Sequence, residues 1–471
     1  MNTLPDIEKD FAQWYQDIIY QAELVDQAPV RGCFIIRPYG WAMWENMQQY
    51  MDARIKATGH QNASFPLFIP QSFIAKEAKH VEGFSPELAV VTHAGGKQLE
   101  EPLVVRPTSE TIIHDSFSRW VRSWRDLPLK LNQWCNVVRW EKRPRAFLRT
   151  TEFFWQEGHT VHETLQEAET EVQLMLNEYV SFIQGQLSIP VFVGEKSASE
   201  RFAGAERTYA VEGIMPDGRA LQMCTSHLLS QSFAHAFNIK FQNREGEQAY
   251  PYLTSWGITT RVVGATIMTH GDQKGLVLPP AIAPIQVVVV AIFKNDEEYQ
   301  AVANELDFIQ SNLADWRVFS DLDRQKTPGA KFYHWELRGV PVRLEIGPRD
   351  AKARQVVLVN RFTGQKTTVP FDQITQVVAA EIKNIQDGLY KKAQERLERL
   401  VIVGQKLTEF GPQLEERGVA CVTGWCQSPE CEQALAPYKA STRVLLDTQK
   451  VTHCFNCSKP SPRDVLIARS Y

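Results

Sequence analysis

The longest apolar stretch of the chain is IQVVVVAIF, residues Ile285–Phe293, in which Gln286 is the one polar residue. A short run so rich in β-branched residues is typical of a strand buried on both faces of a parallel sheet. Segments with helical and strand-like patterns then alternate. We expect a helix at 296–313, a strand at 316–319, a helix at 329–338 and a strand at 340–346. This alternation predicts a small α/β domain.

Two changes of pattern divide the chain into three predicted domains. A proline-rich segment, LPPAIAP, ends a first domain at 1–284, in which helices, strands and aromatic-rich loops are mixed. The α/β domain covers 285–386. The third domain, 387–471, opens with the charged stretch GLYKKAQERLERLVIVGQKL, which predicts a helix over 388–407, and continues into a cysteine-rich segment.

Composition excludes several classes of protein. The 471 residues are 44% hydrophobic and 23% charged, which argues against global disorder. The net charge of −4 rules out a wholly basic nucleic-acid coat protein. No apolar run approaches the roughly 18–20 residues that span a bilayer, and the N-terminus lacks the pattern of a secretory signal. We therefore expect a cytoplasmic protein that does not bind membranes.

One predicted strand of the first domain carries an unusual set of side chains. Alternation places Phe153, Trp155, Glu157 and His159 on the same face. Two aromatic walls with a carboxylate suit a small apolar ligand that bears an ammonium group. Arg139 and Arg149 enclose the preceding loop, where two guanidinium groups can hold a polyphosphate. The alternative is an amphipathic hairpin with exposed charges, since surface arginine is common.

Several longer motifs resemble one enzyme family. The segments RWE, FLRTTEF and WQEGH, between Arg139 and His159, resemble motif 2 of class II aminoacyl-tRNA synthetases in their prolyl form. The segments RPTSE, QMCTSH, SWGITTR and HGDQKGLVLPP are similar to other prolyl-type elements, and 40–70 is similar to the motif 1 helix and strand. The resemblance covers essentially the whole chain. It implies an α+β catalytic domain on an antiparallel sheet, an α/β anticodon-binding domain and a C-terminal zinc-binding α+β domain.

The resemblance also implies the reaction and its residues. Such enzymes activate L-proline with ATP to prolyl-adenylate, release pyrophosphate, and transfer proline to the 3′ end of tRNA(Pro); Mg²⁺ assists. The proline site would comprise Phe84, Thr108, Glu110, Arg139, Trp155, Glu157, His159, Thr225 and His227. The ATP site would comprise Arg139, Glu141, Arg149, Thr150, Gln222, Thr225, Thr259 and Arg261. Arg139, Arg149 and Arg261 would be the catalytic residues, because positive charge stabilises phosphoryl transfer.

Two departures from the family pattern bear on affinity. Thr151 stands where relatives often have arginine, which removes a positive charge near the ATP loop. Met223 and Cys224 are bulkier than the usual pair of small residues. Only about 95 residues separate motif 2 from motif 3, too few for the editing insertion of many bacterial prolyl enzymes. A proline-sized pocket rejects smaller amino acids poorly. We therefore expect some mis-activation of alanine or cysteine, with any clearance by a separate protein.

The α/β domain has features of an RNA-binding surface. Residues 321–366 hold ten Lys or Arg and five Asp or Glu, a local excess of positive charge. The family resemblance assigns anticodon recognition to Phe332, Glu336, Arg343 and Arg349, through stacking and hydrogen bonds to guanine. The alternative is a solvated helix stabilised by contacts four residues apart.

Four cysteines in the third domain have the spacing of a metal site. Cys426, Cys431, Cys454 and Cys457 form two close pairs, and four thiolates favour tetrahedral Zn²⁺ in a structural role. Cys421 has the same spacing from Cys426 as Cys431 has, counted in the other direction; we prefer it as a buried strand residue. The resemblance also implies that the terminal Tyr471 folds back onto the catalytic domain.

The motif 1 resemblance further implies a homodimer. Two other functions stay open at this stage. One is a class II synthetase for a different small amino acid. The other is a paralogue that binds RNA without chemistry, although retention of Arg139, Arg149 and Arg261 argues against it.

Overall fold

The structure is a computed structural model that describes residues 4–75, 88–404 and 406–471. Its largest element is an eleven-stranded sheet with the strand order β20-β21-β23-β22-β9-β10-β11-β14-β8-β7-β3. The six strands that position the site are antiparallel neighbours. They are β9 (Phe192–Glu195), β10 (Arg207–Ile214), β11 (Ala220–Ser230), β14 (Tyr252–Thr259), β8 (Glu152–His162) and β7 (Leu129–Val138).

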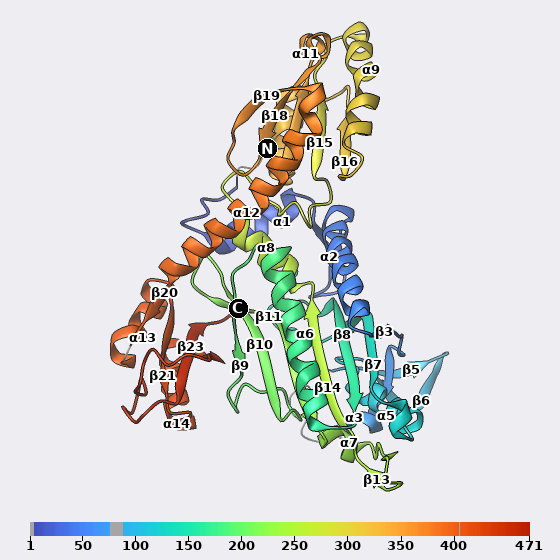
Figure 1. The fold of residues 1–471 in the computed structure, drawn as a ribbon, viewed down its shortest axis with the longest axis vertical. Coiled ribbons are helices and arrows are strands. Elements are labelled where there is room, and N and C mark those ends of the chain that lie inside the picture. The colour runs from blue at the N-terminus through green and yellow to red at the C-terminus, as the bar shows by residue number, and fades with distance from the viewer. Residues whose placement is uncertain (1–3, 76–87, 405) are drawn as a thin grey trace.

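Helices cover this sheet and build the main core. The long helix α6 lies in front of the sheet in Figure 1, roughly along its strands, and packs on β11 and β14. Tyr179 and Phe182 of α6 are buried with Met43 of α2 and with Trp256 of β14. Gly158 on β8 is required beneath Trp256, because an added Cβ would lie 2.0 Å from the indole ring. The helices are α1 (Phe11–Gln21), α2 (Pro38–Ala57), α5 (Glu110–Trp120), α6 (Leu165–Gly185), α7 (Ser232–Ala236) and α8 (Arg261–His270).

Short elements complete the first part of the chain. β3 (Gln61–Asn62) pairs in parallel with β7. A three-stranded sheet contains β4 (Phe68–Pro70), β6 (Lys97–Val105) and β5 (Ala89–Ala94), with α3 (Gln71–Ala75) beside it. Two hairpins pair β1 (Val25–Gln27) with β2 (Phe34–Ile36) and β12 (Phe241–Gln242) with β13 (Gln248–Ala249).

The α/β part, at the top of Figure 1, is a five-stranded mixed sheet. β15 (Val287–Ala291) is fully buried and pairs in parallel with β16 (Val318–Asp321) and β17 (Val342–Ile346), as the apolar run predicts. β18 (Gln355–Asn360) and β19 (Lys366–Pro370) continue it antiparallel. The helices are α9 (Asp296–Asn312), α10 (Pro328–Leu337) and α11 (Pro348–Ala353).

The last part of the chain differs from one prediction. Helix α12 runs unbroken from Ile374 to Leu400, across the predicted boundary at 386. The predicted helix 388–407 is therefore wrong at its end: Val401–Val403 forms strand β20, and α13 (Leu407–Glu416) follows. The β-branched sequence VIV fits a strand paired with β21 better than another helical turn.

The C-terminal strands extend the catalytic sheet. β21 (Ala420–Trp425), β23 (Arg463–Arg469) and β22 (Ala440–Leu445) are hydrogen-bonded neighbours, and Leu445 of β22 pairs with Glu195 of β9. Helix α14 (Pro429–Gln433) lies beside them. The predicted fold class is thus confirmed. Among the described residues no helix is long and apolar enough to cross a membrane.

Candidate active site

A cavity of about 240 Å³ opens on the central strands β8, β11 and β14. The predicted alternation of β8 is confirmed, because Phe153, Trp155, Glu157 and His159 all line it. The cavity also brings together most of the other predicted proline-site residues, from four further elements or their ends. These are Thr108, Glu110, Arg139, Thr225 and His227. Phe84 lies outside the described residues.

Glu157 accepts hydrogen bonds from several residues of the cavity and its surroundings. Its carboxylate accepts hydrogen bonds from Ser109 Oγ at 2.5 Å, Gln133 Nε2 at 2.9 Å and His159 Nε2 at 3.1 Å. Burial raises the pKa of this carboxyl, but the bonds from His159, Ser109 and Gln133 more than offset burial and hold it below its ordinary value. A buried carboxylate with these donors is ionised and fixed in one orientation.

Charge on His159 is favoured by its surroundings. Burial lowers the pKa of the imidazole, but the hydrogen bond and charge of Glu157, with Glu110 nearby, raise it overall. Thr108 Oγ1 donates to the Glu110 carboxylate. The cavity therefore combines three carboxylates, those of Glu110, Glu157 and Glu200, with aromatic walls. This matches the ligand chemistry expected from the sequence: a small ring with a positively charged nitrogen.

A second cavity, of about 110 Å³, adjoins the first. Four residues line both cavities: Arg139, Phe153, Thr259 and Arg261. Arg139 donates through Nε to the Pro107 carbonyl at 3.0 Å, and its guanidinium lies 5.4 and 5.5 Å from the ring centres of Phe153 and Trp155. This arginine therefore stands between the two cavities.

Arg261 is the first residue of α8, and two backbone carbonyl groups from other parts of the chain hold its guanidinium group. It donates to Leu148 O at 3.2 Å and to Gln222 O at 3.0 Å. Burial and the charges of Arg139 and Arg149 lower its pKa to about 10, so it stays protonated at neutral pH. Arg139, Arg149 and Arg261 all line the second cavity, and three guanidinium groups in one place make a site for an anion such as a polyphosphate.

The remaining predicted ATP residues fall into two groups. Glu141, Arg149 and Thr150 line the second cavity, whereas Gln222 and Thr225 line the first. Arg149 Nε lies 3.5 Å from Glu141 Oε2.

Of the three residues that depart from the family pattern, two line the first cavity and one lies outside both cavities. Thr151 is buried against Gly32 and lines neither cavity, while Met223 and Cys224 both line the first.

Sequence reasoning missed several cavity residues. The Phe202 ring packs against the His227 ring, tilted by 35°, with ring centres 4.6 Å apart, and Thr208 Oγ1 lies 3.0 Å from His227 Nδ1. Glu200, Ser255, Trp256 and Gly257 complete the lining. The signal for Ser255–Gly257 is present in the SWGITTR motif. Phe202 and Thr208 belong to a segment without a diagnostic pattern, and only the tertiary fold brings them to the site.

The predicted anticodon residues only partly converge. Arg343 lies over the Phe332 ring at 4.6 Å and donates to Glu345 at 2.9 Å. Glu336 and Arg343 line a cavity of about 120 Å³, together with Lys274 from the catalytic part, whose Nζ lies 3.1 Å from Glu336 Oε1. Arg349 is exposed on α11 and does not line this cavity.

The basic excess of 321–366 is smaller in the folded protein than in the sequence. Four of its arginines pair with acidic residues from outside the segment: Arg324 with Asp296, Arg338 with Glu23, Arg354 with Glu305 and Arg361 with Asp272. Sequence counting cannot anticipate these partners, because two of them, Glu23 and Asp272, come from the catalytic part.

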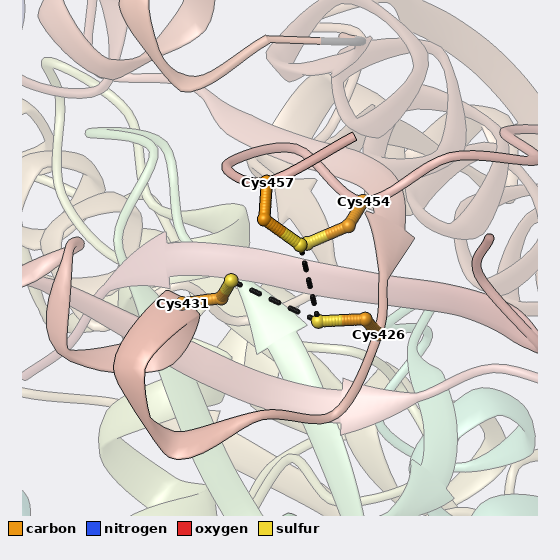
Figure 2. Close-up of side chains that lie close together, drawn as sticks. All are labelled: Cys426, Cys431, Cys454 and Cys457. Atoms are coloured by element: carbon orange, nitrogen blue, oxygen red, sulfur yellow. Dashed lines mark hydrogen bonds between the residues drawn. The ribbon is translucent and has the colours of Figure 1, made fainter. Parts of the chain in front are cut away.

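The four predicted metal ligands form one cluster (Figure 2). Their sulfur atoms lie within 4.8 Å of one another, with Cys426 Sγ 3.7 Å from Cys431 Sγ and 3.6 Å from Cys457 Sγ. Sulfurs placed tetrahedrally around zinc at about 2.3 Å are about 3.8 Å apart, so the donor set fits. Cys421 is buried in β21 and is not part of the cluster, in agreement with its predicted role.

The terminal Tyr471 packs on the catalytic sheet. Its hydroxyl donates to Asp217 Oδ2 at 2.7 Å, its backbone N–H donates to Ala220 O at 3.2 Å, and Arg219 lies 5.7 Å from its ring centre. The terminal residue therefore contacts Ala220, which lies two positions before Gln222 of the first cavity.

Comparisons with known proteins agree with this geometry. Residues 92–270 match the tRNA synthetase class II core domain (G, H, P, S and T), 286–381 an anticodon binding domain, and 407–471 the prolyl-tRNA synthetase C-terminal domain. The chain is 47% identical to a proline–tRNA ligase of Amoebophilus asiaticus, over 99% of each chain. It is 46% identical to proline–tRNA ligase 2 of Bacillus cereus, over 100% of this chain and 99% of the other.

Solved structures give the same result. Prolyl-tRNA synthetase from Cryptosporidium parvum, complexed with halofuginone and AMPPNP, is 40% identical with a TM-score of 0.94, over 100% of this chain and 99% of the other. The same enzyme complexed with L-proline and AMP gives 39% and 0.92 at equal coverage. The chain therefore belongs to the prolyl-tRNA synthetases, the class II aminoacyl-tRNA synthetases that activate proline with ATP and charge tRNA with it.

Proposed function

We propose that the first cavity binds proline, the second binds ATP, and Arg139 joins the two substrates at the reacting atoms. The observation that carries this assignment is the position of Arg139 on the wall that both cavities share. Thr108 and Glu110 hold the proline nitrogen, and Trp155, Glu157, His159, Thr225 and His227 shape the pocket around the ring.

No protein nucleophile is required for this reaction. The proline carboxylate attacks the α-phosphorus of ATP, a new P–O bond forms, and the bond to pyrophosphate breaks. Arg139, Arg149 and Arg261 stabilise the negative charge that spreads over the phosphoryl oxygens. The 3′-terminal hydroxyl of the tRNA then attacks the carbonyl carbon of prolyl-adenylate, and AMP leaves.

Magnesium fits the second cavity, where Glu141 is the carboxylate among the lining residues. Bound there with ATP, Mg²⁺ supplies charge neutralisation to the pyrophosphate leaving group. Thr150, Gln222 and Thr259 provide polar groups for the rest of the nucleotide.

For the other parts of the chain we propose the division 1–284, 285–386 and 387–471 into catalytic, anticodon-binding and zinc-binding domains. Phe332, Glu336, Arg343 and Arg349 contact the anticodon of tRNA(Pro). The four-cysteine cluster holds one structural Zn²⁺.

We also propose a cytoplasmic homodimer formed through the motif 1 region. Mis-activated alanine or cysteine is cleared by a separate editing protein.

ATP–pyrophosphate exchange with each amino acid in turn tests the central assignment. We expect exchange with proline, reduced at least about a hundredfold in Arg139→Ala, since loss of one charged transition-state contact costs about that much. Arg143→Ala is a matched control, because Arg143 is exposed in the same loop and lines neither cavity. Normal exchange by Arg139→Ala would refute the assignment.

A further inference from the structure

A buried cluster of three charged residues joins the C-terminal part of the chain to the catalytic sheet. Glu212 on β10 accepts a hydrogen bond from Lys196 Nζ at 2.9 Å. Its two oxygens also accept from Arg443 Nη2, on β22, at 3.0 and 3.2 Å. The side chains of Lys196, Glu212 and Arg443 are 2%, 0% and 8% exposed. Moving or removing one of the three side chains would leave an uncompensated buried charge. The three side chains are therefore strongly held in this arrangement.

This cluster lies beside the part of the first cavity that Gln222 lines. Glu212 pairs with Gln222 across the β10–β11 ladder, and Gln222 lines the cavity while its carbonyl oxygen accepts the bond from Arg261. The ladder is irregular at this point: Val211 pairs with Cys224 and Glu212 with Gln222, so Met223 is an extra residue in β11. Bulges of this kind re-aim side chains next to active sites.

Electrostatics connect the same groups. The pKa of Arg261 is lowered mainly by burial, Arg139 and Arg149; Glu212 acts in the opposite direction and Arg443 adds to the lowering. Glu212 is thus an anion whose charge acts on Arg261, and two cations, Lys196 and Arg443, hold it. Without Arg443, the Glu212 carboxylate would have one partner fewer and would compete with a polyphosphate for Arg261.

We propose that Arg443 is a positioning residue for ATP: the C-terminal domain holds Glu212, and through it Gln222 and Arg261, in the arrangement that binds the nucleotide. Arg443 touches neither substrate, since it lines neither cavity. This role rests on the proposed placement of ATP and gives the C-terminal domain a part in activation besides any metal it holds.

The test measures KM for ATP and for proline in pyrophosphate exchange by Arg443→Met. We expect KM for ATP to rise about tenfold, with KM for proline changed less than about twofold. Arg463→Met is the matched control, because Arg463 on β23 makes another ion pair between the same two parts, to Glu195 at 2.8 Å. Arg463 lies away from Gln222 in the strand order and should leave both constants unchanged.

Arg443→Lys keeps the buried charge and gives a second measurement if Arg443→Met does not fold. It loses the two-point hold on Glu212, and we expect KM for ATP to rise about threefold. An unchanged KM for ATP in a folded Arg443 variant, or equal rises in the Arg443 and Arg463 variants, would overturn the proposal. Absence of proline-dependent exchange in the unaltered enzyme would instead refute the function on which it rests.

Discussion

At the scale of single residues, Glu157 determines how the proline cavity is organised. We predict that Glu157→Gln raises KM for proline about tenfold, because hydrogen bonds to a charged acceptor contribute about 1.5–3 kcal/mol each. The amide would also turn one N–H group toward donors such as His159. KM for ATP should stay nearly constant in pyrophosphate exchange. Glu163→Gln, just beyond the end of β8, is the control; an unchanged KM for proline would contradict the assignment.

A second residue-scale prediction concerns pH. His270 is buried at the end of α8, with Nε2 2.7 Å from Leu187 O, and burial lowers its pKa from 6.5 to about 3. The unfolded chain therefore binds a proton below pH 6.5 that the folded protein does not, and stability falls as the pH falls from 6.5 toward 3. Between pH 7.5 and 5.5 this residue should cost about 1.4 kcal/mol.

Urea unfolding at the two pH values measures this loss. In His270→Gln the decrease in the free energy of unfolding should be smaller by about that amount than in the unaltered protein. His93→Gln, at an exposed position, should show the full decrease. An equal pH dependence in all three proteins would show that His270 is not the group responsible.

Prediction from sequence succeeds at this scale where local geometry decides. Alternation along one strand suffices to gather Phe153, Trp155, Glu157 and His159. Ser109 and Gln133 were not predicted as partners of Glu157, because hydrogen bonds across 48 and 24 residues of sequence depend on the tertiary fold.

At the scale of elements, helix α8 connects the active-site cavities to the anticodon-binding part of the chain. Arg261 begins the helix, and just beyond its last residue Asp272 binds Arg361 of the anticodon part at 2.7 Å. Lys274, two residues further, contacts Glu336. A guanine that uses Oε1 of the Glu336 carboxylate would compete with Lys274 for that oxygen, and this exposed ion pair costs little to break.

We accordingly predict that Glu336→Gln raises KM for tRNA(Pro) in aminoacylation about tenfold, since it weakens charged hydrogen bonds to a base. Pyrophosphate exchange without tRNA should be unchanged. Glu305→Gln is the control, because Glu305 also forms an exposed ion pair in this domain, with Arg354 at 3.1 Å. Equal effects of the two variants on KM for tRNA would refute a specific role for Glu336.

Sequence patterns predicted five elements of the α/β domain, β15, α9, β16, α10 and β17, to within two residues, because their apolar spacing is regular. No prediction was made for α11, β18 and β19. They failed where a helix meets a strand without a turn. Leu400 and Val401 are adjacent, both are good core residues, and the change of structure between them is set by pairing of β20 with β21. Such pairing is a tertiary effect that local propensity does not carry.

At the scale of the whole molecule, the cysteine cluster should stabilise rather than catalyse, because it lies in the C-terminal part of the chain and lines neither cavity. We predict one zinc ion per chain by elemental analysis, lost in Cys454→Ser. Thermal unfolding of this variant should occur more than about 5 °C lower. Cys421→Ser should keep its zinc. Full metal content in Cys454→Ser would exclude the four-thiolate site.

The pairing of β22 with β9 has a consequence for shortened forms of this chain. In the strand order, β9 is the outermost strand of the catalytic part next to the C-terminal strands. β22 pairs with its outer edge where Leu445 lies opposite Glu195. A protein ending at Leu400 would present the backbone N–H and C=O groups of this edge to water, as an open template for strands of other molecules. Truncation should therefore produce aggregates, and a soluble catalytic fragment would need a charged or proline residue introduced into β9.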